Sequence, residues 1–166
     1  MRAGYTRTLV LAALFAALGV LLSLFAVPVG GARVLPFQHA INAVAGVALG
    51  PWWAAGSALV TALLRIGFGT GSLFAIPGSI FGALAVGFAY RWLRRDAAGL
   101  AEPLGTVLLG APAGALLLAP FLGGATGGVL ALATAFALSS IPGAFVGYLL
   151  LKALRRAGFP ARSEDS

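Results

Sequence analysis

The chain has 166 residues, of which 60% are hydrophobic and only 9% are charged, whereas soluble domains are about 45–50% apolar and about 25% charged. Together with a mean hydropathy of +1.01, this composition excludes an ordinary soluble globule and predicts an all-α, polytopic membrane protein. The lack of cysteine excludes disulfides, thiolate zinc sites and cysteine nucleophiles. The net charge of +7 does not indicate nucleic-acid binding, because the basic residues lie between apolar segments.

Long stretches without Asp, Glu, Lys or Arg define the predicted helices, and they cover residues 8–32, 34–64, 66–90 and 103–151. Because a spanning helix needs about 20 residues, the first and third stretches hold one helix each and the last holds two. The second stretch is interrupted at Gly50-Pro51, which predicts helices over 37–49 and 52–65. We therefore expect six transmembrane helices within residues 1–156, which form one domain.

The two ends of the chain carry further expectations. The tail over 157–166 is polar and is expected to be a disordered cytoplasmic segment. A cleaved signal peptide is the alternative reading of the run from Thr8 to Val27, although this run is longer than a typical signal-peptide core.

The distribution of basic residues predicts the orientation. If both termini are cytoplasmic, nine of the 11 basic residues fall on the cytoplasmic side: Arg2, Arg7, Arg91, Arg94, Arg95, Lys152, Arg155, Arg156 and Arg162. The positive-inside rule therefore favours a cytoplasmic N-terminus and a cytoplasmic C-terminus. The three tryptophans, Trp52, Trp53 and Trp92, are expected at the same interface.

Few residues could support catalysis or energy coupling. The acids are Asp96, Glu102, Glu164 and Asp165, and we expect none of them inside a span. The single histidine excludes a multi-histidine metal site, so we expect no enzyme, no metal and no cofactor. The sequence contains no phosphate-binding G-x-x-x-x-G-K-[ST] motif and, on this interpretation, no intramembrane carboxylate. Uphill transport would then need a partner that supplies the energy.

Three neutral polar residues, Gln38, His39 and Asn42, lie on one side of the second predicted helix, just after Pro36. Their donors and acceptors carry no fixed charge, which favours a small neutral polar heterocycle as ligand. The alternative is that these side chains satisfy backbone groups of the preceding loop.

A second polar stripe follows on the third helix, where Ser57, Thr61 and Arg65 recur every four residues. For Arg65 we favour outward snorkelling or capping of its own helix over ligand contact. The glycine-rich run from Gly67 to Ser72 can bring backbone amides close to a small ligand.

Pairs of small residues four apart mark helix-packing surfaces. Gly78 with Gly82, Gly110 with Gly114, and Gly143 with Gly147 are expected to be internal contacts. The first helix carries two adjacent alanine ridges, Ala12 with Ala16 and Ala13 with Ala17. One ridge could face the bundle while the other faces a partner.

Several blocks together resemble the signature of the ThiW family: Pro36-Phe37-Gln38-His39-Ala40-Ile41-Asn42, Ala45-Gly46-Val47, Leu49-Gly50-Pro51-Trp52, Arg65 with Gly69-Thr70-Gly71, Pro77-Gly78-Ser79 and Tyr90-Arg91. The similarity covers nearly the whole chain, but the loop around Arg94 to Leu100 and the fifth helix show little match.

The resemblance implies a six-helix S component, the substrate-capturing subunit of an energy-coupling factor (ECF) transporter in the bacterial plasma membrane. It implies uptake of hydroxyethylthiazole, the thiazole precursor of thiamin, and assembly with a transmembrane T component and two cytoplasmic ATPases. An alanine motif of the first helix is expected to dock on the T component, and its candidates are Ala12, Ala13, Ala16 and Ala17. The candidate substrate-binding residues are Gln38, His39, Asn42, Arg65, Thr70, Ser72 and Ser79.

Other classes of function stay open at this stage. One is a solitary facilitative carrier for a small neutral heterocycle, and another is an S component for a different vitamin precursor. A purely structural membrane protein without a ligand is a further alternative.

Overall fold

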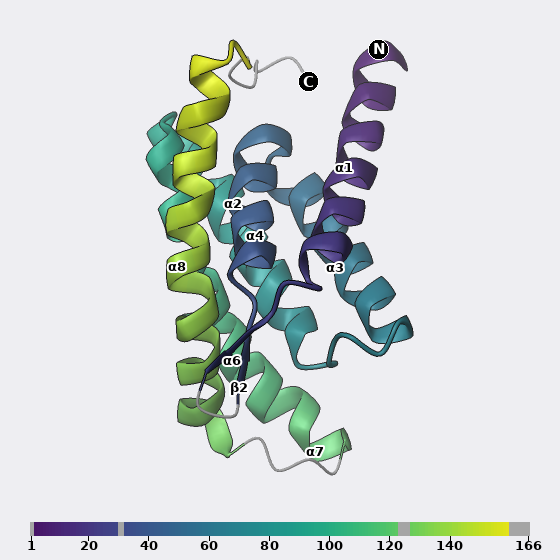
Figure 1. Ribbon diagram of the computed structural model, residues 1–166, viewed down its shortest axis with the longest axis vertical. Coiled ribbons are helices and arrows are strands. Elements are labelled where there is room, and N and C mark those ends of the chain that lie inside the picture. Colours follow the sequence, from purple (N-terminus) through teal and green to yellow (C-terminus); the bar gives the residue numbers. More distant parts are fainter. Residues whose placement is uncertain (1, 30–31, 123–126, 160–166) are drawn as a thin grey trace.

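The computed structural model describes residues 2–29, 32–122 and 127–159, and it is a bundle of helices (Figure 1). The elements follow one another as α1 (Arg2–Leu22), β1 (Val27–Val29), β2 (Ala32–Val34), α2 (Pro36–Leu49), α3 (Pro51–Gly67), α4 (Ala75–Leu93), η1 (Asp96–Ala101), α5 (Glu102–Gly105), η2 (Thr106–Gly110), α6 (Ala111–Ala113), η3 (Gly114–Leu118), α7 (Ala119–Leu122) and α8 (Gly128–Arg156). The stretch from η1 to α7 is one helical segment with 3-10 and π turns, so the described residues form six helical segments.

The helix boundaries have local causes in the sequence. Pro36 and Pro51 occupy the first positions of α2 and α3, where a missing N–H costs nothing. Gly50 separates these helices with a φ of 80°, a conformation that glycine adopts readily. The structure thus confirms the two predicted helices over 37–49 and 52–65 to within two residues.

Helix α2 is the central element of the bundle and packs against α1, α3, α4 and α8. Small residues make these approaches possible. A Cβ atom at Gly147 would lie 2.7 Å from the Cβ of Ala43, and one at Gly110 would overlap the backbone of Gly78. The glycine pairs therefore serve internal packing, as the sequence predicts.

Both ends of the described chain lie at the same end of the bundle (Figure 1). The first turns of α1, the end of α4 and the end of α8 lie at this end, where Arg155 forms an ion pair with Asp96 at 3.0 Å. The β-hairpin and helix α7 lie at the opposite end. Basic residues therefore gather at the end that holds the termini.

Three described helices are long and apolar enough to cross a membrane: Gly4–Leu22, Asp96–Leu122 and Gly128–Arg156. Helices α2 and α3 have only 14 and 17 residues. The all-helical, membrane-protein character agrees with the prediction, while the number of spans and the orientation stay predictions. Most of the tail, residues 160–166, lies outside the described residues.

Two expectations need correction. A short antiparallel hairpin pairs Val27 with Val34 between α1 and α2, and no alternating pattern in the sequence announced it. The fifth helical segment begins at Asp96 rather than after Glu102. Glu102 thus lies inside a candidate span and is wholly buried, so the expectation that no acid lies inside a span is wrong.

Candidate functional site

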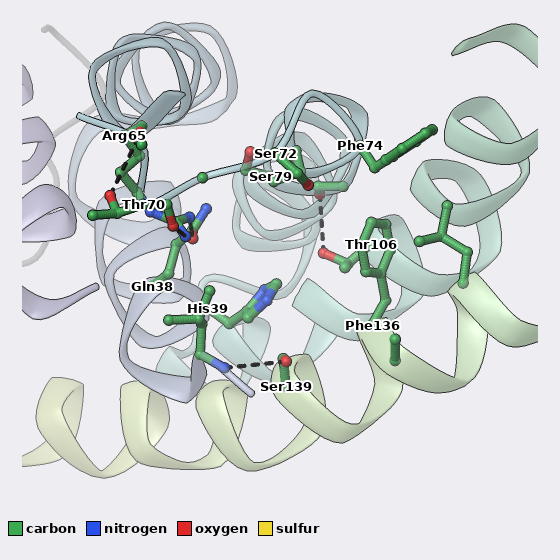
Figure 2. Close-up of a pocket in the computed structure, with 17 residues that line it drawn as sticks. Gln38, His39, Arg65, Thr70, Ser72, Phe74, Ser79, Thr106, Phe136 and Ser139 are labelled. Atoms are coloured by element: carbon green, nitrogen blue, oxygen red, sulfur yellow. Dashed lines mark hydrogen bonds between the residues drawn. The ribbon is translucent and has the colours of Figure 1, made fainter. Parts of the chain in front are cut away.

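A cavity of about 400 Å³ lies in the half of the bundle away from the chain termini. Its walls come from the start of α2, the end of α3, the α3–α4 connection, the start of α4, η2 and the first half of α8 (Figure 2). Leu35, Phe74, Leu132 and Phe136 contribute apolar surface, whereas Gln38, His39, Arg65, Thr70, Ser72, Ser79, Thr106 and Ser139 contribute polar groups. An apolar pocket with a few converging polar groups is the usual form of a small-molecule site.

Arg65 connects the elements of one cavity wall through hydrogen bonds. Its side chain is only 1% exposed; Nη1 donates to Oε1 of Gln38, and Nη2 donates to the backbone oxygen of Thr70 at 3.1 Å. The backbone amides of Thr70 and Gly71 in turn donate to the Arg65 carbonyl at 2.9 and 3.0 Å. Arg65 thus faces inward, in contrast to the snorkelling role that the sequence favoured, and it holds the glycine-rich connection against α2.

His39 forms the second polar centre and contacts a carboxylate. Its Nδ1 lies 2.7 Å from Oε1 of Glu102. The hydroxyl of Thr106 lies 2.8 Å from the same oxygen, and the amide nitrogen of Asn42 lies 3.4 Å from it. Gln38 and His39 are therefore joined to a cation and an acid, two charged neighbours that the sequence analysis did not pair with them.

Six of the seven predicted substrate-binding residues line the cavity, and Asn42 is the exception. Asn42 is 4% exposed and donates to the backbone oxygen of Ser79 and to Glu102, both at 3.4 Å. Ser79 lines the cavity, but its hydroxyl donates to the Ala75 carbonyl at 2.6 Å. Asn42 supports the site from behind rather than facing a ligand.

The rest of the polar stripe on α3 serves packing. The Ser57 hydroxyl donates to the backbone oxygen of Ala12 at 2.8 Å, and that of Thr61 lies 3.3 Å from the oxygen of Ala16. These contacts fasten α3 to α1 and bury the ridge of Ala12 and Ala16, which are 7% and 4% exposed. Ala13 and Ala17 stay exposed on the outer face of α1.

Several site residues escaped the sequence analysis. Thr106 follows Glu102 by four residues, a helical spacing that pairs two polar groups on one face. The α8 residues Leu132, Phe136 and Ser139 also recur at helical spacing. That spacing alone does not say which face of a uniformly apolar helix turns inward. Within the described residues, no cluster of three or more His, Asp or Glu side chains offers a metal site.

The comparisons with known proteins bear on the family. Comparison with curated proteins and with solved structures found no match. The family model described as thiamine-precursor transporter protein (ThiW) matches residues 9–157. This range includes α2, α3, α4 and the whole cavity wall. The chain therefore belongs to the ThiW family of thiamine-precursor transporter proteins.

Proposed function

We propose that the protein is the S component of an ECF transporter and captures hydroxyethylthiazole from the outer side of the bacterial plasma membrane. Membership of a thiamine-precursor transporter family supports a substrate of this class. The cavity supports a small one, because about 400 Å³ is near the lower end of ligand-pocket volumes, roughly 300–1,000 Å³.

The cavity wall suits a flat heterocycle that carries one polar arm. The rings of Phe74 and Phe136 provide apolar surface, which can cover the faces of a thiazole ring. The Phe136 ring lies against Gly78, where an added Cβ would come within 2.8 Å of it. Gln38 and His39 offer hydrogen-bonding groups from a neighbouring wall. Because both lie at the start of α2, one helix would orient the polar arm of the ligand.

The proposed partners are a transmembrane T component and two cytoplasmic ATPases, since the chain has no nucleotide-binding motif of its own. The outward ridge of Ala13 and Ala17 is the proposed contact with the T component. The inward ridge of Ala12 and Ala16 is already covered by α3. Small residues let two helices approach closely in lipid, where no hydrophobic force drives them together.

Ligand titration tests the substrate. The purified parent protein should bind hydroxyethylthiazole, and Gln38→Ala should weaken binding about 5- to 150-fold, because a buried hydrogen bond is lost. Thr134→Ala is a matched control, since Thr134 lies on α8 but is exposed and bonds only to the Leu130 carbonyl of its own helix. If the parent binds no thiazole, or if Gln38→Ala binds as tightly as the parent, this assignment fails.

A second candidate function, a solitary carrier, is favoured by one observation. The buried Glu102 lies inside a candidate span, and an ionisable group within a membrane is of the kind that couples transport to ions. Uptake into vesicles that contain this chain alone separates the two functions. An S component should show no uptake without its T component and ATPases. A solitary carrier should transport the solute, and its uptake should persist when ATP is depleted.

A further inference from the structure

Glu102 is a charged group behind the cavity to which the proposed S component assigns no task. It is 0% exposed and lies behind the cavity wall, in contact with two wall residues, His39 and Thr106. Its carboxylate occupies space that Gly82 leaves free on α4, because a Cβ there would overlap Oε1 of Glu102 and the Thr106 hydroxyl. The fold therefore provides a fitted position for this carboxylate.

Several polar groups behind the cavity wall converge on one oxygen of Glu102. Polar groups of His39, Asn42 and Thr106 lie within hydrogen-bond distance of Oε1, and the Thr106 hydroxyl also lies 3.0 Å from the Gly78 carbonyl. No described residue bonds to Oε2. An ionised carboxylate only accepts hydrogen bonds, so with Glu102 ionised the His39 imidazole and the Asn42 amide both donate to Oε1.

The contact with an ionised Glu102 has a consequence for the tautomer of the imidazole. If Nδ1 donates its proton to Glu102, the neutral ring has an unprotonated Nε2. Among the described residues no group bonds to Nε2, and the imidazole lines the cavity. A lone pair is then offered to whatever occupies the cavity.

We propose that Glu102 is a positioning residue that locks His39 as the Nδ1–H tautomer, so that Nε2 accepts a hydrogen bond from an O–H or N–H group of the ligand. For hydroxyethylthiazole, and resting on the proposed function, that group is the side-chain hydroxyl, because the ring nitrogen and sulfur carry no hydrogen. The site thereby selects heterocycles that carry a donor arm over those that carry only acceptors.

Nitrogen-15 NMR tests the tautomer without any ligand. The chain has a single histidine, so protein labelled with ¹⁵N-histidine and purified through a non-histidine tag gives the signals of His39 alone. An unprotonated ring nitrogen resonates far downfield of a protonated one, and couplings to the ring protons distinguish Nε2 from Nδ1. We expect Nδ1 protonated and Nε2 unprotonated at neutral pH. A protonated Nε2, in either the other tautomer or an imidazolium, overturns the proposal.

Variants separate positioning from folding. Glu102→Ala removes the acceptor, so the imidazole should revert toward the Nε2–H tautomer that free histidine prefers. Thr106→Val removes another bond to the same carboxylate oxygen while leaving the imidazole contact, and it should keep the parent tautomer. If Glu102→Ala keeps Nδ1 protonated, Glu102 does not position the ring. Should Glu102→Ala fail to fold, Glu102→Leu removes the acceptor while filling more of the space, and the parent spectrum alone still decides the tautomer.

Ligand analogues test the acceptor. The methyl ether of hydroxyethylthiazole keeps the oxygen but has no donor, so the parent should bind it about 5- to 150-fold more weakly than the alcohol. That ratio should shrink toward one in Glu102→Ala. Equal affinity of alcohol and ether for the parent overturns the acceptor role. If neither compound binds, the proposed substrate is wrong, while the NMR result still stands for the positioning role.

Discussion

The outward alanine ridge gives the sharpest prediction about assembly. Ala13→Leu and Ala17→Leu place a larger side chain on the exposed face of α1. No bundle contact is lost, so thermal stability and ligand affinity should stay at the parent level. A T component that approaches through this ridge would be held away by the added side chain, so complex formation and transport should be lost.

The inward ridge provides the matched control, and its magnitude follows from the contacts. A leucine at Ala12, which is 7% exposed, overpacks the contact with α3 and costs about 1–3 kcal/mol. Moving α1 outward also stretches the bond from Ser57 to the Ala12 carbonyl, worth about 0.5–1.5 kcal/mol. Ala12→Leu should therefore lose about 2–4 kcal/mol and lower the Tm in detergent by about 5–15 °C.

Two assays on the same four variants separate the readings. Thermal unfolding in detergent reports folding, and co-purification with the T component reports docking. The expected pattern is a normal Tm with lost docking for Ala13→Leu and Ala17→Leu, and a lowered Tm for Ala12→Leu and Ala16→Leu. Normal docking by both outward variants would refute the proposed contact.

Three further predictions concern packing, orientation and the cavity wall. Gly82→Ala should lower the Tm by about 3–10 °C, because the added methyl overlaps the buried carboxylate. Gly56→Ala is the control: Gly56 has open space around it, so the Tm should be unchanged or slightly raised. In intact cells an impermeant thiol reagent should label Phe68→Cys and miss the exposed Ala97→Cys, and the opposite pattern would reverse the proposed orientation. Arg65→Lys replaces a guanidinium that donates to two acceptors with a single ammonium and should weaken ligand binding about 5- to 150-fold. Affinity equal to the parent in a calorimetric titration would contradict the role of Arg65 in holding the cavity wall.

The sequence predicted the helices where local chemistry decides the boundary. Gly50 and Pro51 mark a break that is visible without any tertiary information, and the structure places it at the same residues. The fifth segment was misjudged because a charged residue was taken to end an apolar span. Asp96 and Glu102 are instead held within the segment by Arg155 and His39, partners that lie about 60 residues away in the sequence. Such compensation depends on tertiary contacts and leaves no local signal.

The candidate site was predictable in part for the same reason. The residues at the start of α2 are adjacent in sequence, so helical spacing alone grouped them on one face. Arg65 was assigned an outward role because an isolated arginine near a helix end usually snorkels. Its inward position depends on the oxygen of Gln38 and the carbonyl of Thr70, which only the fold brings near it. The sequence could not identify the α8 residues that line the cavity, since every face of that helix carries apolar residues.

In the contact between α1 and α3, the two helices contribute different kinds of groups. The donor is the Ser57 side chain of α3, with the Thr61 hydroxyl shared between the Ser57 and Ala16 carbonyls, whereas the acceptors on α1 are backbone carbonyls. No substitution on α1 removes a carbonyl, so α1 must supply only residues small enough to be approached. The sequence of α1 is therefore limited to small residues on the face toward α3, whereas α3 places no demand on its outer face. Helix α1 can change its outer surface to suit a new partner while α3 continues to hold it in the same place.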